Sequence, residues 1–351
     1  MNLLQREQWH QAGASDFFCF GGGRGLRMLV ACLRKLGWLD RLVAVVDNRS
    51  SSWGSTLSIG EHQWPVISPE ELRATIGGRS VIISCLAREE IQTQLEGYPE
   101  LQDTTVAFYR DIVEESLIEF ARQMTFPHGV RRTDKPLIPK IIHYCWFGGN
   151  PIPSEFQQYI EGWKRMCPDY EIRRWDESNY DVTKNAYMKD AYDAKKWGFV
   201  PDYARLDILY QYGGFYLDTD VELVKPLDDL RYNKVCMGME KSDCVALGLG
   251  VGAVPHHPLI KELRDAYESY QFVDFHKRSE FLEGKIIASP TLQSKVLEPL
   301  GFQYDCCQLQ DLGDIRIYPL PVLCGLVAGT VVLTEYTYAI HHSAGTWIPK
   351  E

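Results

Sequence analysis

The fold is decided by residues 202–220, which read DYARLDILYQYGGFYLDTD. Apolar residues recur at helical spacing through the first half of this stretch, and the Gly213-Gly214 pair ends the predicted helix. The next three residues predict a short buried strand, because a continuous apolar run bounded by a glycine turn is typical of one. That strand places Asp218 and Asp220 at its carboxyl end.

Two carboxylates one residue apart at the end of a buried strand need a counter-charge. Hard oxygen ligands suit Mg²⁺ or Mn²⁺, which keep open positions for water or for the phosphates of a substrate. A cation held by Asp218 and Asp220 would neutralise a diphosphate leaving group. The D-x-D pattern alone is also typical of solvated turns, so the surrounding sequence must decide between a metal site and a turn.

The context is a second charged pair, Asp202 and Arg205, one helix earlier. Their spacing places both side chains on one face of the helix. An exposed surface ion pair would show the same spacing. Because this helix runs directly into the D-x-D strand, we expect the pair to share a pocket with the metal site. A carboxylate and a guanidinium there can hold the hydroxyls of a sugar.

These motifs resemble the sugar-binding region of glycosyltransferase family 32, a family of D-x-D enzymes that includes capsular polysaccharide synthesis transferases and is related to the glucosylating domains of clostridial toxins. Residues 138–149, IPKIIHYCWFGG, resemble the opening strand of these families, and residues 340–347 resemble their closing His/Ser/Trp segment. The likeness covers about residues 137–348. It implies a GT-A fold, a nucleotide-sugar donor and retention of anomeric configuration.

The resemblance implies a nucleotide-sugar site of seven residues: Trp146, Asp202, Arg205, Tyr216, Asp218, Ser343 and Trp347. Trp146 would stack on the donor base, for which an indole offers a flat face. Asp202 and Arg205 would hold hydroxyls of the donor sugar. Ser343 and Trp347 would close over the diphosphate.

The resemblance also implies a catalytic set, Asp202, Arg205, Asp218 and Asp220, around a bound Mn²⁺ or Mg²⁺. Tyr216 and Asp218 would contact the nucleotide or the metal-bound phosphate, and Asp220 would ligate the metal directly. His341 is a further candidate ligand, although an imidazole is softer than Mg²⁺ prefers. The predicted metal set is therefore Asp218, Asp220 and His341.

One segment departs from the family pattern. Relatives often carry an Asn after the D-x-D strand, but residues 246–252 read ALGLGVG and contain neither an amide nor an acid. Glu240 and Asp243 are the nearby side chains that would replace such a ligand. The sequence also offers no clear nucleophile for the other face of the sugar. We therefore expect front-side displacement, in which the leaving phosphate itself acts as the base.

Residues 1–125 alternate short apolar strands with helical segments, which predicts a parallel sheet covered by helices. Strands are expected at Phe17–Phe20, Leu42–Val46, Val81–Ser84 and Thr105–Tyr109. Gly21, Gly23 and Gly25 follow the first strand, and Asp47 follows the second. This pattern resembles a dinucleotide fingerprint, in which amides cradle phosphate and the acid binds ribose hydroxyls.

The same residues resemble Rossmann-like domains of sugar-modifying acyltransferases. No catalytic Tyr/Lys pair supports nicotinamide chemistry. A role in binding a nucleotide sugar or in positioning the acceptor is favoured over an independent activity. The predicted fold class is therefore α/β, with a Rossmann-like domain over residues 1–125, a linker over 126–136 and a GT-A domain over 137–351.

The composition bounds the remaining alternatives. The net charge of −10 repels a phosphate backbone, so no nucleic-acid partner is expected. The ten cysteines contain no CxxC and predict reduced, buried thiols. Neither a signal-peptide core nor an apolar run of about 18 residues is present, so a cytoplasmic location is expected. The oligomeric state is not encoded in any recognisable pattern.

The sequence thus favours a metal-dependent retaining glycosyltransferase that moves galactose or glucose from a UDP-hexose to a glycan acceptor in bacterial surface polysaccharide synthesis. The acceptor would be a glycan or a lipid-linked glycan, and a lipid-linked one is compatible with peripheral membrane association. Two alternatives stay open. One is a D-x-D phosphoryl transferase or hydrolase with an aspartyl nucleophile, and the other is a non-catalytic nucleotide-sugar-binding protein.

Overall fold

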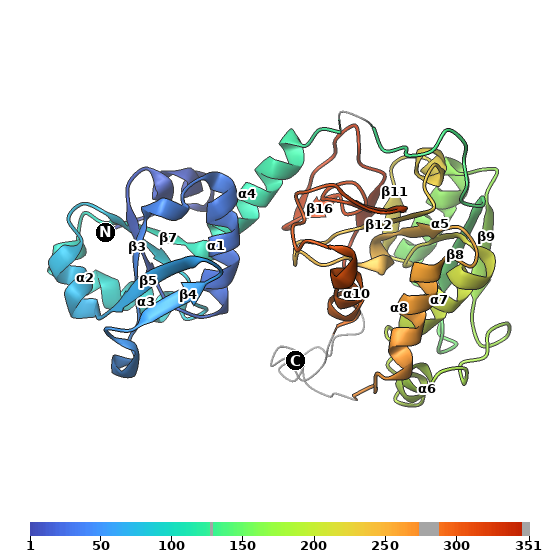
Figure 1. The fold of residues 1–351 in the computed structure, drawn as a ribbon, viewed down its shortest axis with the longest axis horizontal. Coiled ribbons are helices and arrows are strands. Elements are labelled where there is room, and N and C mark those ends of the chain that lie inside the picture. Colours follow the sequence, from blue (N-terminus) through green and yellow to red (C-terminus); the bar gives the residue numbers. More distant parts are fainter. Residues whose placement is uncertain (127–128, 274–287, 346–351) are drawn as a thin grey trace. The chain divides into compact units, whose positions relative to one another are not determined.

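The computed structural model describes residues 1–126, 129–273 and 288–345 (Figure 1). The chain forms two compact units, Met1–Phe120 and Ala121–Glu351. No helix among the described residues has both the length and the apolar character that crossing a membrane requires.

A seven-stranded sheet with the order β1-β7-β6-β2-β3-β5-β4 forms the centre of the N-terminal unit. All of its pairings are parallel except that of β4 with β5. The strands are β1 (Asn2–Leu3), β2 (Phe17–Phe20), β3 (Leu42–Val46), β4 (Thr56–Ile59), β5 (His62–Ile67), β6 (Ser80–Ile83) and β7 (Thr105–Phe108). The helices are α1 (Arg24–Leu36), α2 (Pro69–Thr75), α3 (Arg88–Glu96) and α4 (Tyr109–Gln123), with short 3-10 helices η1 (Arg6–Gly13), η2 (Leu39–Arg41), η3 (Ser50–Ser52) and η4 (Pro99–Leu101).

The parallel α/β sheet predicted for this unit is present. Strands β2 and β3 have the predicted bounds, while β6 and β7 each end one residue earlier than expected. Helix α1 ends where Gly37 adopts a left-handed conformation and caps the carbonyl of Leu33. The β4–β5 hairpin was not predicted. Pro65 lies inside β5, and a proline within an apolar run argues against a strand.

The C-terminal unit contains a second seven-stranded sheet, with the order β14-β15-β12-β13-β10-β8-β9. Strands β8, β9 and β10 are mutually parallel, and β13 runs antiparallel between β10 and β12. The strands of this sheet are β8 (Ile141–Cys145), β9 (Glu171–Trp175), β10 (Gly214–Tyr216), β12 (Val235–Gly238), β13 (Val251–Ala253), β14 (Gln310–Leu312) and β15 (Ile315–Tyr318). Two small ribbons pair β11 (Val221–Leu223) with β18 (Ala339–His341) and β16 (Leu326–Val327) with β17 (Thr330–Val331).

The described helices of this unit are α5 (Ser154–Met166), α6 (Ala186–Asp193), α7 (Val200–Tyr212), α8 (Pro258–Asp265) and α10 (Ser289–Leu297). Short 3-10 helices are η5 (Leu227–Arg231), η6 (Leu247–Leu249), η7 (Ala266–Glu268) and η8 (Glu298–Leu300). The chain is thus a mixed α/β protein, as the sequence predicted. Helix α7 and strand β10 together are the helix-turn-strand unit expected from residues 202–220.

The turn between α7 and β10 requires both of its glycines. Gly213 and Gly214 have φ angles of 62° and 93°, a region that L side chains rarely adopt. A β-carbon on Gly213 would lie 2.7 Å from the ring of Pro255, and one on Gly214 would lie 2.7 Å from the carbonyl oxygen of Ile141. The turn therefore brings β10 closely against β8.

His143 on β8 holds this turn from the other side. The indole N–H of Trp175 donates to Nδ1 of His143 at 3.1 Å, so Nε2 carries the proton and donates to the carbonyl of Gly213 at 2.9 Å. Burial lowers the pKa of His143 to about 4. The imidazole is therefore neutral and structural at physiological pH.

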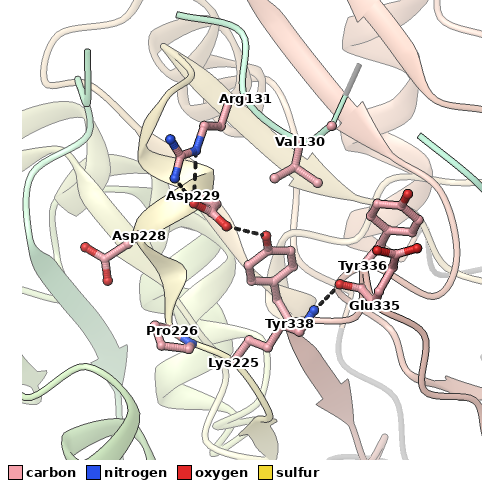
Figure 2. A pocket seen from close by; sticks show the side chains of 10 residues that line it. Val130, Arg131, Lys225, Pro226, Asp228, Asp229, Glu335, Tyr336 and Tyr338 are labelled. Carbon is pink, nitrogen blue, oxygen red and sulfur yellow. Dashed lines mark hydrogen bonds and ion pairs between the residues drawn. The ribbon is translucent and has the colours of Figure 1, made fainter. Parts of the chain in front are cut away.

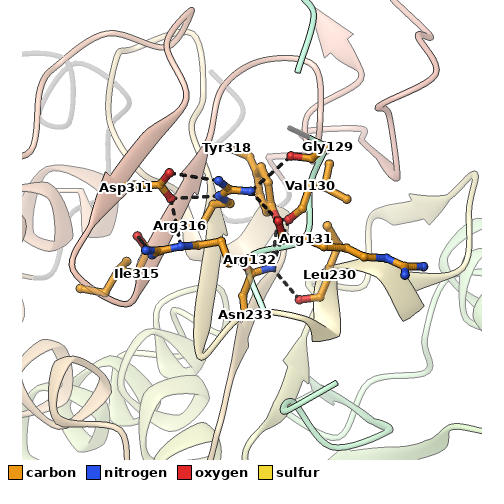
Figure 3. A network of polar contacts seen from close by, with 10 residues as sticks. All are labelled: Gly129, Val130, Arg131, Arg132, Leu230, Asn233, Asp311, Ile315, Arg316 and Tyr318. Atoms are coloured by element: carbon orange, nitrogen blue, oxygen red, sulfur yellow. Dashed lines mark hydrogen bonds and ion pairs between the residues drawn. The ribbon is translucent and has the colours of Figure 1, made fainter. Parts of the chain in front are cut away.

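Residues 129–133, which lie within the predicted linker, are held by the C-terminal unit (Figure 3). Arg316 forms a bidentate ion pair with Asp311 at 2.9 and 3.0 Å, and it also donates to the carbonyls of Gly129 and Arg131 at 3.3 Å. The hydroxyl of Tyr318 donates to the carbonyl of Val130 at 2.7 Å. The backbone of this segment therefore supplies acceptors to a buried polar network.

Candidate active site

A cleft of about 830 Å³ opens at the carboxyl ends of β8 and β10. Because these strands are parallel and adjacent, Trp146 after β8 and the D-x-D motif after β10 reach the same edge of the sheet. The loop after α6 contributes another part of the wall through residues 195–198, and the closing segment contributes His341 and Ser343.

Asp220 is tied to the closing segment by the β11–β18 ribbon, in which Val221 pairs with His341. Its Oδ1 lies 3.2 Å from Nε2 of His341, and its Oδ2 accepts the backbone N–H of Ala344 at 2.9 Å. The other imidazole nitrogen contacts the hydroxyl of Ser343 at 3.1 Å. Burial favours protonation of Asp220, but the His341 contact and the Ala344 amide outweigh it and lower the pKa of Asp220.

Asp218, Asp220 and His341 form a candidate metal centre. One donor atom from each lies within 4.8 Å of the others. Carboxylate oxygens suit Mg²⁺ and Mn²⁺, whereas an imidazole favours a softer ion than Mg²⁺. The three residues therefore fit a divalent cation, and the mixed donor set fits Mn²⁺ better than Mg²⁺.

Asp202 and Arg205 lie behind Asp218, each with only 4% of its surface exposed. The Arg205 guanidinium lies 3.2 Å from Oδ1 of Asp202 and 3.5 Å from Oδ1 of Asp218. It also lies over the ring of Tyr216, 5.1 Å from the ring centroid. The pair is therefore a buried link to the D-x-D motif and not an exposed surface ion pair. Neither residue lines the cleft, so the prediction that the pair shares one pocket with the metal site is wrong in that respect.

The charges of this link are set by burial and by one another. Burial raises the pKa of Asp202 to about 6, although Arg205 and the hydroxyl of Tyr187 favour its ionised form. Tyr187 donates to Oδ2 of Asp202 at 3.0 Å. Burial disfavours the charged guanidinium of Arg205, but the negative charge of Asp218 and then of the other neighbours outweighs it and raises the pKa of Arg205.

The structure places most of the predicted residues at the cleft. Its wall includes Trp146, Tyr216, Asp218, Asp220, Glu240, His341 and Ser343. The indole N–H of Trp146 donates to the carbonyl of Asn150 at 2.6 Å. Asp243 does not line the cleft, and its carboxylate instead accepts the backbone N–H of Cys306 at 2.8 Å. Trp347 lies outside the described residues.

Sequence reasoning missed the part of the wall formed by Lys195, Lys196 and Trp197. No motif marks these residues, because they lie in a connection between two helices. The one available signal is Gly148, which has a φ angle of 92°. A β-carbon at Gly148 would lie 2.6 Å from the ring of Trp197, so this glycine makes room for the indole.

The candidate ligand residues of the N-terminal unit also lie at one sheet edge. Gly23 is the N-cap of α1, and a β-carbon on Gly25 would lie 2.2 Å from the carbonyl of Ser84, so Gly25 permits close helix–strand packing. Gly21 has a φ angle of 111°. Asp47 is engaged by Arg49, whose guanidinium donates to it at 3.1 and 2.9 Å.

A second hollow, of about 650 Å³, lies beside the segment that contains Arg131 (Figure 2). Two of its charged side chains pair with each other, and a third donates to the backbone. Arg131 pairs with Asp229, which also accepts from the hydroxyl of Tyr338 at 3.2 Å, and Lys225 donates to the carbonyl of Glu335. These contacts hold the wall of the hollow together.

Comparison with known proteins identifies a family that part of the chain matches. Residues 153–236 match the family described as "Glycosyltransferase sugar-binding region containing DXD motif". The chain is 32% identical over 152 residues to inositol phosphoceramide mannosyltransferase 2 of Schizosaccharomyces pombe. The aligned stretch covers 39% of this chain and 41% of the relative. It is 28% identical over 155 residues to the initiation-specific alpha-1,6-mannosyltransferase of Candida albicans, covering 41% of this chain and 39% of the relative.

The chain spans less than half the length of these two relatives. Among solved structures, the PaToxG glycosyltransferase matches with a TM-score of 0.37 and 17% identity, over 54% of this chain and 75% of that one. The family match confirms the resemblance that residues 202–222 indicated, and the relatives support a transferase. The similarity to this family lies in residues 153–236, which contain both the D-x-x-R and the D-x-D motifs.

Proposed function

We propose that the C-terminal unit is a metal-dependent, retaining hexosyltransferase of GT-A type that transfers a hexose from a nucleotide sugar to a hydroxyl group. The observation that carries this proposal is the buried link from Asp202 through Arg205 to Asp218. It joins two groups that can hold sugar hydroxyls to a candidate metal centre that can hold a diphosphate. Asp218 lines the cleft, and Asp202 and Arg205, which do not line it themselves, are joined to that carboxylate from behind.

The protein's side chains position and orient the substrate. Asp218, Asp220 and His341 would hold Mn²⁺, which supplies positive charge for the leaving diphosphate when bound. Asp202 and Arg205 would orient the sugar. The incoming hydroxyl would attack on the face from which the diphosphate departs, and its proton would pass to a phosphate oxygen of the leaving group. The cleft would exclude water around the anomeric carbon.

The names of the relatives refine the choice of hexose. Two of them are mannosyltransferases, so mannose joins the galactose and glucose favoured from the sequence. The Schizosaccharomyces pombe relative is named for inositol phosphoceramide, a lipid, and this name supports a lipid-linked acceptor over a free surface glycan. Peripheral association with a membrane from the cytoplasmic side would suit such an acceptor.

The test is a donor-hydrolysis screen, because a glycosyltransferase often hydrolyses its own donor slowly and no acceptor need be known. UDP-glucose, UDP-galactose and GDP-mannose are incubated with the full chain, with and without Mn²⁺. Release of hexose from one donor, dependent on Mn²⁺ and absent in Asp220→Asn, is expected. No release from any donor, together with no nucleotide binding by calorimetry, would refute the proposal.

Two further measurements separate the remaining alternatives. NMR of the anomeric centre in the released or transferred sugar should show retained configuration, and an inverted centre would exclude front-side displacement. A phosphoryl transferase would instead form an aspartyl-phosphate at Asp218, which mass spectrometry after acid quenching detects. Donor binding without any turnover would point to the nucleotide-sugar-binding protein.

For the N-terminal unit, we propose a Rossmann-like ligand-binding role without redox chemistry. Support comes from the sheet, in which β3 lies on one side of β2 and β6 lies on the other, so the glycine loop after β2 lies where the strand order reverses. Calorimetry with nucleotides on Asp47→Ala and on the intact chain tests this role. Identical binding by both proteins would exclude Asp47.

A further inference from the structure

Several polar atoms behind Asp202 are buried without a partner. Gln293 is 1% exposed, and neither its amide nitrogen nor its amide oxygen has a hydrogen-bond partner among the described residues. The same holds, within the described part of the chain, for the hydroxyl of Tyr267 and for Nε of Arg205. Buried polar groups are nearly always paired, so unpaired groups gathered in one place require an explanation.

Tyr267 lies near both the pair that we place at the donor sugar and Gln293. Ser289 and Gln293 lie one turn apart on α10 and therefore on the same face of that helix. The hydroxyl of Ser289 lies near enough to Asp202 to favour the ionised form of that carboxylate. The negative charge of Asp202 raises the pKa of Tyr267, and the positive charge of Arg205 lowers it. The amide of Gln293 also lies near enough to the hydroxyl of Tyr267 to lower this pKa, without the geometry of a hydrogen bond. Burial is nevertheless the larger effect and raises the pKa of Tyr267.

The chemistry of the unpaired atoms matches one class of ligand. A primary amide offers a donor and an acceptor side by side. A sugar hydroxyl both donates and accepts, so it can pair with both functions of the amide. A site that buries such groups discriminates strongly against a ligand that lacks the matching hydroxyl, because the amide is then left unpaired.

We propose that Gln293 is a specificity-determining residue of the sugar subsite and that its amide pairs with a hydroxyl of the hexose held by Asp202 and Arg205. This inference rests on the proposed transferase function. Helix α10 would then take a direct part in selecting the donor, although it lies outside both the D-x-D motif and the D-x-x-R motif. Tyr267 and Ser289 act as positioning residues beside it.

The experiment compares Gln293→Leu with a matched control, Gln310→Leu. Gln310 is also buried, but its amide is fully used: Nε2 donates to the carbonyl of Gln303 at 2.7 Å, and Oε1 accepts the backbone N–H of Gln303 at 2.8 Å. Melting temperature is measured for both variants in the full chain without ligand. Gln310→Leu should lower it, whereas Gln293→Leu should not, because no protein partner is lost.

The second measurement is calorimetry in Mn²⁺ with UDP and GDP and with UDP-glucose, UDP-galactose and GDP-mannose. The gain in affinity from nucleoside diphosphate to nucleotide sugar reports the sugar contacts alone. In Gln293→Leu this gain should fall about tenfold, a loss typical of one buried hydrogen-bonded pair, while binding of the free diphosphate stays the same. The preference among the three sugars should flatten.

Each other outcome overturns the inference. A fall in melting temperature equal to that of Gln310→Leu would mean that the protein itself pairs the amide. An unchanged sugar gain in Gln293→Leu would mean that the amide does not contact the sugar. Absence of any sugar gain in the unaltered protein would instead be a failure of the proposed function, and it is visible without either variant.

Discussion

A β-carbon built on Gly248 would lie 2.0 Å from Oδ2 of Asp218. The carbonyl of Gly248 also accepts the backbone N–H of Asp218 at 3.0 Å, so the two residues are held against each other. Gly248 belongs to the segment that departs from the family pattern by lacking an Asn. At this position the segment supplies space for the first carboxylate of the D-x-D motif.

Replacement Gly248→Ala should therefore displace the carboxylate of Asp218. The added methyl group meets the end of a flexible side chain, so the free energy of unfolding should change by no more than about 1 kcal/mol. Affinity for Mn²⁺ and donor turnover should both fall at least about tenfold, because a shifted ligand loses its geometry. Calorimetric titration with Mn²⁺ and the hydrolysis assay measure the two effects.

The matched control is Gly162→Ala in α5, where the nearest atom to a new β-carbon is the guanidinium of Arg165 at 3.7 Å. Alanine is the better helix former, so this variant should be as active as the unaltered protein and more stable by roughly 0.5–1 kcal/mol. Equal Mn²⁺ affinity in Gly248→Ala and Gly162→Ala would show that the contact with Asp218 has no effect on the metal centre.

The second prediction concerns Asp220, which combines a metal-facing position with a structural contact to Ala344. Asp220→Asn keeps the size of the side chain and an oxygen for the Ala344 amide but removes the charge. Mn²⁺ affinity and turnover should fall roughly a hundredfold or more, since a direct ligand matters more than an outer contact. Asp243→Asn, whose side chain faces Cys306 away from the cleft, is the control and should retain Mn²⁺ binding.

The helix-turn-strand unit was predictable because its signals are local. A helical period, two glycines and three apolar residues fix α7, the turn and β10, and spacing alone places Asp202 beside Arg205. The burial of Asp202 and Arg205 could not be predicted in the same way. It depends on α6 and α8 packing against the helix, and a pair of charged residues three apart looks the same on a buried or an exposed face.

The parts that escaped prediction depend on long-range contacts. Residues 195–197 reach the cleft only because the connection between α6 and α7 passes it, and Gly248 meets Asp218 through a tertiary contact between distant segments. His341 was reached by resemblance, and its physical cause is the pairing of β11 with β18. Single-sequence patterns report periodicity along the chain and carry little information on such pairings.

The third prediction tests the network at Arg316. Arg316→Gln would leave the carbonyls of Gly129 and Arg131 without their donor and would leave Asp311 with only the weaker contact from Arg132 at 3.5 Å. Trypsin should then cleave after Arg131 and Arg132 several times faster, because local opening of a segment controls its proteolysis. Arg73→Gln, which breaks an exposed pair with Glu100 and a contact with the ring of Tyr98 in the N-terminal unit, should leave the cleavage rate unchanged. An unchanged rate in Arg316→Gln would mean that other contacts hold the segment.

The last prediction is a pH dependence of stability that originates at His143. Its pKa lies at about 4 in the folded chain because burial disfavours the imidazolium, against 6.5 when unfolded. Between these values the unfolded state binds the extra proton, so stability is fully present above about pH 6.5 and decreases as the pH falls toward about 4. The loss should amount to about 3 kcal/mol, from the size of this difference in pKa. Urea unfolding at pH 7.5 and 4.5 measures it.

In His143→Gln, the titrating ring is gone while an amide can still reach Gly213 and Trp175. This variant should be less stable at pH 7.5 by roughly 1–3 kcal/mol, since its hydrogen bonds fit less well. Its further loss between pH 7.5 and 4.5 should be smaller than that of the unaltered chain, because every other group titrates equally in both proteins. Indole fluorescence, to which Trp175 contributes, follows the unfolding. An equal loss in the two proteins would place the acid sensitivity at groups other than His143.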